Sequence, residues 1–173
     1  MPGKVIGTSM NVGFPGSYAR TPDCIMKARK VKTTGFDFGD PVVLNTDNTY
    51  TKFGASGTLA KFAGFAVREV KQFAGSFTSQ GDGSYAVGDV ADVLERGEIC
   101  VTVTRGTPVA GGAVYVRTVL GGTPDSGAVV GGIEAEAPGD GGTSIQLTNC
   151  AFSTGEMDAN GVAEVVVKTR NNA

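Results

Sequence analysis

The stretch that decides the fold lies between residues 62 and 117, and it consists of three short apolar runs separated by glycine turns. Within them, apolar side chains alternate with polar or small ones, which places neighbours on opposite faces of a β-strand. The polar residues are spaced for turns and surfaces, and no reaction centre is recognisable among them. The runs read FAGFAVREV over residues 62–70, YAVGDVADVLERGEICVTV over residues 85–103 and PVAGGAVYVR over residues 108–117.

The strand pattern extends along the rest of the chain. Ile99, Val101 and Val103 share one face of a half-buried strand, and the run 162–167 is apolar on both faces, which is typical of a central strand. Residues 24–31 fit a strand or a helical turn equally well. No helical period exceeds about ten residues. The expected fold class is therefore all-β, with a single small β-barrel or β-sandwich body.

Glycine is abundant in the chain, with 27 residues, and many of them are expected in the turns between strands. Paired glycines recur every ten residues from Gly111 to Gly142, which we interpret as a rhythm of strands and turns because the intervening residues do not match. Residues 121–142 are predicted to form a long loop region. Arg96 and Gly97 are predicted to mark a boundary between two strands, with Gly97 supplying a positive φ or a bulge.

The first 22 residues combine glycine and proline with two aromatic side chains, Phe14 and Tyr18. Such density supports neither a helix nor a central strand. We expect residues 1–22 to form an extended N-terminal arm and residues 23–173 to form the β-rich domain. The aromatic residues are expected to pack either on the body of the same chain or on another subunit, and the sequence does not decide between these alternatives.

Composition argues against several function classes. The 173 residues fit one domain, and 15 basic residues against 17 acidic ones give a net charge of −2, which argues against nucleic acid as the main partner. The one basic run, residues 27–32, is interpreted as a solvated strand or arm, with a phosphate contact as the alternative. No apolar run approaches the ~20 residues of a membrane helix, and no signal peptide is recognisable, so we expect neither a membrane partner nor export.

Histidine is absent from the sequence, which removes the usual general base and the commonest metal ligand. Cys24, Cys100 and Cys150 lie far apart and lack the spacing of a metal cluster. Cys100 is expected to be a small buried apolar residue, and a disulfide among the three is left open. We therefore predict no catalytic residue, no metal and no cofactor.

Two groups of acidic residues are explained more simply by turns and surface charges than by metal binding or catalysis. Asp158, Asn160 and Gly161, with Glu156 nearby, imitate part of a calcium loop but lack its remaining ligands, so a hairpin turn is expected. A second acidic grouping is expected on a solvated face or in ion pairs between subunits, with Arg96 as a candidate partner for any of its members. The alternative is acid–base catalysis, which paired carboxylates can perform. The members of this second grouping are Asp82, Asp89, Asp92, Glu95 and Glu98.

An ordered series of motifs resembles the structural cement, or capsid decoration, proteins of tailed bacteriophages. The resemblance covers most of residues 11–120 and does not extend past Gly121. Its motifs are GFPG at 13–16, FDFGDPVV at 36–43, GFAVRE at 64–69, the run 85–101 with its Arg-Gly pair, and residues 108–117.

The resemblance implies a small β-rich protein on the outer surface of the virion head, made in the cytoplasm of the host bacterium. It implies the major capsid protein as partner, and a homotrimer that bridges capsid subunits. Aromatic and arginine side chains are enriched at protein interfaces, so we select interface candidates on that basis. They are Phe14, Pro15, Tyr18 and Arg20 as arm contacts, and Arg68, Arg96 and Arg117 as partners in interface ion pairs.

A different function class fits the same composition. Acidic, glycine-rich, all-β chains also serve as receptor- or glycan-binding modules of phage fibres and tail tips, and residues 121–142 would then form the binding loop. An enzyme is the least favoured hypothesis, since it would need a pair of carboxylates within about 5–10 Å of each other in a cleft.

Overall fold

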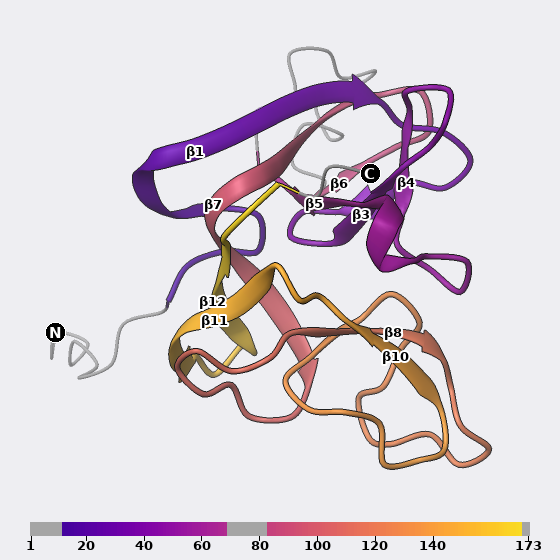
Figure 1. Ribbon diagram of the computed structural model, residues 1–173, viewed down its shortest axis with the longest axis vertical. Helices are drawn as coiled ribbons and strands as arrows, with labels where there is room; N and C mark the ends of the chain where they lie inside the picture. Colours follow the sequence, from indigo (N-terminus) through magenta and orange to yellow (C-terminus); the bar gives the residue numbers. More distant parts are fainter. Residues whose placement is uncertain (1–11, 69–82, 171–173) are drawn as a thin grey trace, which may run out of the picture.

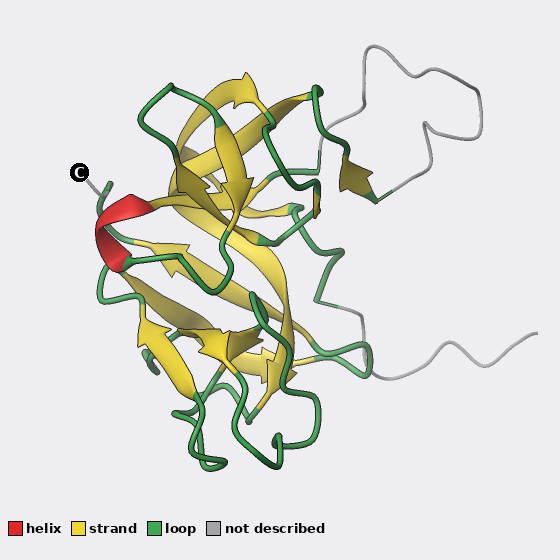
Figure 2. Cartoon of the chain, turned by 90° about the vertical axis from the view of Figure 1, so that its right-hand side faces the viewer, coloured by secondary structure: helices red, strands yellow, loops and turns green. Residues whose placement is uncertain are grey.

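A computed structural model describes residues 12–68 and 83–170, and these residues fold almost entirely as β-strands (Figures 1 and 2). Within these two ranges, the one helical element is the short 3-10 turn η1, Leu59–Lys61. The strands are β1 Tyr18–Lys30, β2 Phe36–Asp37, β3 Pro41–Leu44, β4 Tyr50–Lys52, β5 Phe62–Ala66, β6 Ser84–Tyr85, β7 Val90–Arg105, β8 Tyr115–Val119, β9 Ile133–Glu134, β10 Thr143–Gln146, β11 Cys150–Met157 and β12 Val162–Val167.

β7 is the spine of the molecule and runs from the upper half of Figure 1 to the lower half. It pairs antiparallel with β1, β5 and β12 and parallel with β9. The long sheet follows the order β10-β8-β9-β7-β5-β3-β4, with β1, β11 and β12 attached beside it, and β2 and β6 form a separate pair. β7 therefore joins the strands of the two halves into one body.

The expected all-β class is confirmed, but the barrel alternative is not, because the sheets do not close. β10 and β4 end the sheet path, and in the described part of the chain they do not pair with each other. The body is consistent with a sandwich. Residues 24–31, which fitted either a strand or a helical turn, lie mostly in β1, and β12 is the predicted central strand, held between β11 and β7.

The predicted strand boundary at Arg96 and Gly97 is wrong, because β7 continues through both residues. Gly97 has φ +126°, and the pairing with β1 is irregular around Ile25, opposite this point. A side chain on Gly97 would come within 2.8 Å of the carbonyl oxygen of Asp23. A glycine inside a strand can thus mark a close approach of a neighbouring backbone as well as a turn.

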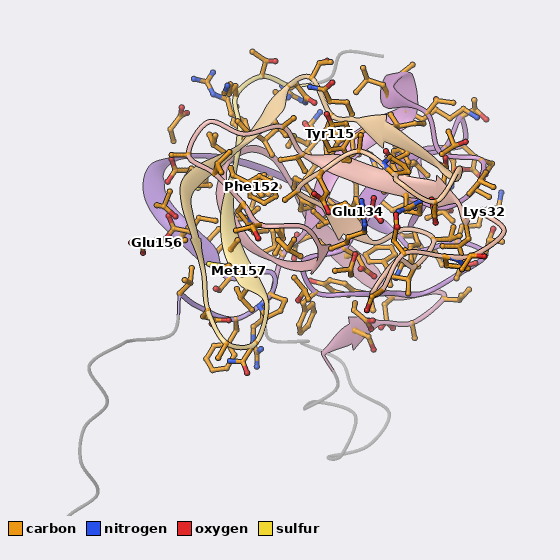
Figure 3. All side chains as sticks on the ribbon, turned by 90° about the horizontal axis from the view of Figure 1, so that it is seen from below. Lys32, Tyr115, Glu134, Phe152, Glu156 and Met157 are labelled. Atoms are coloured by element: carbon orange, nitrogen blue, oxygen red, sulfur yellow. The ribbon has the colours of Figure 1, made fainter. Side chains whose placement is uncertain are left out.

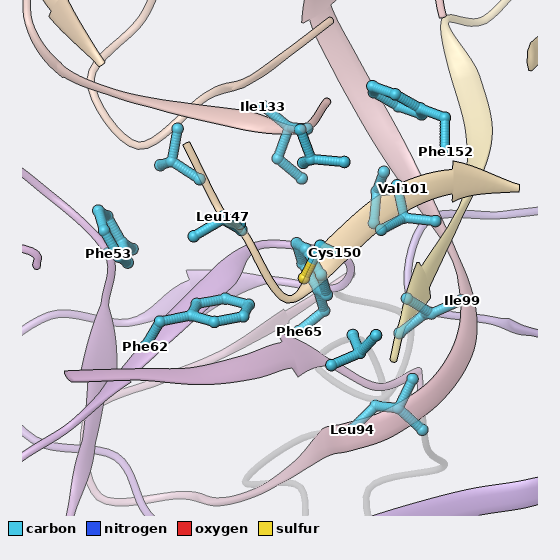
Figure 4. Close-up of a cluster of buried hydrophobic side chains, with 14 of the residues drawn as sticks. Phe53, Phe62, Phe65, Leu94, Ile99, Val101, Ile133, Leu147, Cys150 and Phe152 are labelled. Carbon is cyan, nitrogen blue, oxygen red and sulfur yellow. The ribbon is translucent and has the colours of Figure 1, made fainter. Parts of the chain in front are cut away.

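Two apolar clusters stabilise the body, and they lie on opposite faces of β5. Phe65 belongs to the larger cluster, whose aromatic rings meet edge to face, with 5.4 Å between the centroids of Phe62 and Phe65 (Figure 4). Ala66, the next residue, belongs to the smaller cluster with Phe36 and Tyr85. The alternation that predicts a strand here therefore also divides the core in two.

Residues 121–142, predicted to be a long loop region, form turns interrupted by β9. Ile133 of β9 is buried and pairs with Val103 of β7 and Val116 of β8. This one short strand anchors the glycine-rich region to the spine.

Candidate interaction surface

The N-terminal segment 12–17 lies on the body of its own chain. Gly16 donates a hydrogen bond from its backbone N–H to the carbonyl oxygen of Cys100 at 2.8 Å, and the N–H of Cys100 donates to Ser17 at 2.9 Å. The N–H of Arg68 donates to the carbonyl oxygen of Gly16 at 2.7 Å. Gly16 has φ +79°, and a side chain there would meet Phe38 and two backbone atoms. Glycine is therefore required where the segment turns onto the body.

This attachment divides the expected arm. Residues 1–11 lie outside the described residues, and residues 12–17 lie on β7. Tyr18 already begins β1, so the expected arm boundary after residue 22 falls inside a strand. Of the two alternatives for the N-terminal aromatic residues, packing on the same chain describes Tyr18, which is half-buried against the larger apolar cluster.

Phe14 behaves differently, because 63% of its surface remains exposed although its backbone is fixed. The guanidinium carbon of Arg68 lies 5.1 Å from the centroid of the Phe14 ring and 5.8 Å from that of Phe38. Cation–π contacts of this kind are worth about 0.5–1 kcal/mol at exposed sites. Arg68 thus holds an apolar ring in place on the surface without covering it.

A hollow of about 380 Å³ lies beside this ring, and Pro15, Phe38 and Arg68 form part of its wall. Residues from distant parts of the chain, including Thr102 and Val129, form another part. We call Phe14, Pro15, Phe38 and Arg68, together with this hollow, the Phe14 surface. It combines an exposed aromatic ring, an arginine and a concave neighbour, a combination that is typical of the centre of protein interfaces.

A half-buried ion pair lies in the wall of the hollow. Lys52 Nζ lies 2.7 Å from Asp40 Oδ2, which also accepts a hydrogen bond from the N–H of Asp37 at 2.8 Å. Burial raises the pKa of Asp40, and its contacts with Lys52 act in the opposite direction. The two charges compensate each other, so the hollow presents mixed polar and apolar walls.

The structure brings three of the seven predicted interface residues together, namely Phe14, Pro15 and Arg68. The backbone of Arg20 in β1 lies opposite Glu98 in β7, and the side chain of Arg20 is outside the described part of the structure. Arg96 is exposed and pairs with Asp23, with Nη2 and Oδ2 2.8 Å apart.

Arg117 has an internal role in place of the interface role expected for it. Its side chain is fully buried, with Nε 2.8 Å from Glu134 Oε1 and Nη1 2.7 Å from Asp140 Oδ1. Arg105 lies 3.1 Å from Asp125, which also approaches Arg117 at 3.5 Å. We call these five side chains the buried charge network. It fixes the glycine-rich region 121–142 and leaves Arg117 no surface to offer a neighbour.

Asp140 is held both by Arg117 and by backbone N–H groups. Burial favours its neutral form, but hydrogen bonds from the N–H groups of Gly142 at 2.8 Å and Gly121 at 3.2 Å, and from Arg117, favour the carboxylate. The pKa of Asp140 is therefore well below its usual range. No local pattern predicts this network, because its members come from three different strands, β7, β8 and β9, and from two turns of region 121–142.

Glu95 also differs from expectation, since it is buried and Arg96 is not its partner. Three cations of the same chain surround its carboxylate: Arg170 Nη2 at 2.6 Å, Arg29 Nη1 at 3.4 Å and Lys27 Nζ at 3.6 Å. Two residues of the basic run therefore serve an internal ion pair. Asp82, from the same acidic grouping, lies outside the described residues.

The predicted hairpin turn at Asp158 is confirmed. Asp158 Oδ1 accepts hydrogen bonds from the N–H groups of Asn160 at 2.8 Å and Val162 at 3.0 Å, and Gly161 has φ +76°. The bond from Val162 is the main cause of a lowered pKa for Asp158. This carboxylate shapes the turn between β11 and β12.

Residues 12–68 and 83–170 do not meet the requirements of a metal site, a disulfide or a membrane helix. No group of three or more Cys, Asp or Glu side chains there is placed to hold a metal ion. Cys24, Cys100 and Cys150 are free thiols, and Cys100 is buried as predicted, which raises its pKa. Within the same ranges, no helix has the length and apolar character needed to cross a bilayer.

Two comparisons find known proteins that are similar to this chain. A family model described as "Structural cement protein (E217 gp24/Pam3 gp6)" matches residues 2–168. A similar solved structure is a chain of "The capsid of Myoviridae Phage XM1", with a TM-score of 0.67, 20% identity, and coverage of 95% of this chain and 96% of that chain. At that identity the likeness shows the fold alone. No curated protein matches the chain.

Proposed function

The chain belongs to the structural cement protein family, and we propose that it binds the outer surface of an assembled bacteriophage head and bridges neighbouring major capsid subunits. Family membership makes it a structural, stabilising component of a phage capsid and implies a role without catalysis. The proposal adds the partner, the location on the shell and self-association as a trimer. It favours the capsid over a fibre or tail-tip receptor module.

The Phe14 surface is the observation that carries the proposal. Phe14 is 63% exposed, and three backbone hydrogen bonds of residues 16 and 17 together with Arg68 hold its ring in a fixed place. A ring that is ordered before binding loses little conformational entropy when a partner covers it. In the proposal, an apolar part of a capsid subunit covers Phe14 and reaches into the adjacent hollow.

Stabilisation then follows from linkage. A ligand that binds the assembled shell and not its separated subunits shifts the assembly equilibrium by RT ln(1 + [L]/Kd), which is about 2.7 kcal/mol at a hundredfold excess over Kd. A copy that contacts two subunits at once, or is held in a trimer, gains further through effective concentration. Moderate contacts by each copy are therefore enough to stabilise a shell.

The proposal is tested by measuring cosedimentation of the purified protein with empty mature heads. Phe14→Ala removes the exposed ring, and we expect Kd to rise about tenfold, as for an aromatic residue at the centre of an interface. Val87→Ala is the matched control, because Val87 is 59% exposed and lies outside the Phe14 surface. We expect this control to bind like the wild type.

Two results count against the proposal at different levels. Equal binding by Phe14→Ala and Val87→Ala would move the contact away from the Phe14 surface and leave capsid binding intact. Absence of any binding of the wild-type chain to mature heads would contradict the proposed function itself. Thermal unfolding of each variant, measured alongside, separates lost contact from lost folding.

A further inference from the structure

Charge is distributed unevenly along the chain, although the net charge is small. Residues 12–68 contain eight Lys or Arg and four Asp or Glu, whereas residues 106–165 contain one Arg and seven Asp or Glu. The first segment provides β1 to β5, in the upper half of Figure 1, and the second provides β8 to β11 and most of β12, in the lower half. The folded chain therefore has a basic half and an acidic half.

The basic half contains a hollow that suits an acidic side chain. Lys32 and Lys61 line this hollow, which measures about 260 Å³, together with the polar side chains of Asn45 and Thr46. Lys32 forms an ion pair with Asp47 on the same rim. Lys61 is exposed and has no ion pair with a residue in the described ranges. We call this feature the lysine hollow, and Lys61 is its cation without an acidic partner in the described ranges.

The acidic half carries an ordered hairpin, formed by the end of β11 and the turn into β12. Glu156 is exposed there, and no cation in the described part of the chain pairs with it. Its neighbour Met157 is 41% exposed, although methionine is usually buried. The hydrogen bonds of Asp158 keep the turn in shape. The ordered hairpin thus exposes both an anionic and an apolar side chain.

Figure 3 shows Glu156 and Lys32 pointing outward on opposite sides of the molecule. The hairpin and the lysine hollow of one chain therefore do not meet, but those of two successive copies have the right charges to do so. We propose that the β11–β12 hairpin of one copy docks into the lysine hollow of a second copy of this chain, with Glu156 facing Lys61.

Such a contact is head to tail, because different patches of the two copies meet. A head-to-tail contact generates a closed ring when its rotation closes, as in a trimer, and an open filament when it does not. The inference deepens the proposed self-association and rests on that part of the proposed function, but it does not depend on binding to the capsid. Its electrostatic part also requires sensitivity to salt, since the Debye length falls from about 30 Å at 0.01 M to about 3 Å at 1 M.

The test is sedimentation equilibrium of the purified full chain at low and high salt. We expect wild-type chains to associate at about 0.01 M salt and to dissociate towards monomers at about 1 M. Glu156→Lys and Lys61→Glu should each weaken association about tenfold, since each converts an attraction into a repulsion. The double variant with both changes should recover association. Lys168→Glu makes the same change in net charge outside the lysine hollow and should associate like the wild type.

A second measurement needs no variant. A carbodiimide joins carboxylates to amines in direct contact, so a wild-type link from Glu156 to Lys61 or Lys32, identified by mass spectrometry, can arise only between copies. Monomers at every salt concentration, failure of the double variant to recover, or links confined to other pairs would each overturn the inference. Loss of head binding by Glu156→Lys with unchanged self-association would overturn it as well, because the hairpin would then contact the capsid. Capsid binding of the wild type, measured separately, reports on the proposed function.

Discussion

Removal of the Arg117 side chain tests whether the buried charge network holds the glycine-rich region together. Arg117→Met keeps much of the side-chain volume but leaves Glu134 and Asp140 without the cation that lies 2.8 and 2.7 Å from them. Breaking a buried ion pair from one side costs about 3–5 kcal/mol, because the remaining charge stays buried without compensation. For a chain of this length, that corresponds to a fall in Tm of about 6–20 °C.

The assay is thermal and urea unfolding of the wild type, Arg117→Met and Arg96→Met. Arg96→Met makes the same substitution at an exposed pair, where the side chains of Arg96 and Asp23 are 45% and 70% exposed, so it should cost less than about 1 kcal/mol. Adding Glu134→Gln to Arg117→Met should recover part of the loss, because it removes one of the two buried carboxylates that lose Arg117 and leaves Glu134 only the longer contact with Arg105, at 3.9 Å, to lose. Arg117→Met no less stable than Arg96→Met would refute the reasoning.

Two further predictions concern single residues. The pKa of Asp140 is depressed in the folded chain, so its ionised carboxylate stabilises the fold above its unfolded pKa of about 3.9, and this stabilisation is lost as the pH falls further. The difference in free energy of unfolding between the wild type and Asp140→Asn, measured by urea titration, should therefore narrow from pH 7 to pH 2. A constant difference would contradict this prediction. Gly64→Ala should destabilise the chain by about 1–3 kcal/mol or more, because a Cβ there would lie 1.9 Å from the carbonyl oxygen of Leu94. Gly122 has open space around it, so Gly122→Ala should leave the stability unchanged. Equal urea midpoints for the two variants would contradict the assigned contact at Gly64.

The strands were predictable because their signals are local. Alternation around Phe65 and Ile99 and the doubly apolar run 162–167 identify strands that the structure contains, and residues 65 and 66 do face different clusters. The wrong strand boundary at Gly97 also comes from a local signal, because the sequence does not distinguish a glycine required by a close neighbouring backbone from a glycine in a turn. Positive φ there was foreseen, but continuity of the strand was not.

The candidate site was only partly predictable, because its contacts join distant positions. Phe14 and Arg68 were selected separately, and their stacking depends on how residues 12–17 lie on β7. Arg117 was assigned to the surface because alternation cannot show what covers the second face of a strand. In β8, Val116, Arg117 and Thr118 are all buried. Region 121–142 provides the acidic residues that surround Arg117, and local sequence patterns do not predict the path of its backbone.

The central claim is that this chain stabilises a shell through contact alone. Its most direct test is the thermal disruption temperature of empty mature heads, measured with and without the purified protein at saturating occupancy. The account predicts a higher disruption temperature that increases with protein concentration, in line with about 2.7 kcal/mol for each site at a hundredfold excess over Kd. An unchanged disruption temperature with every site occupied would contradict it, even if binding itself is tight.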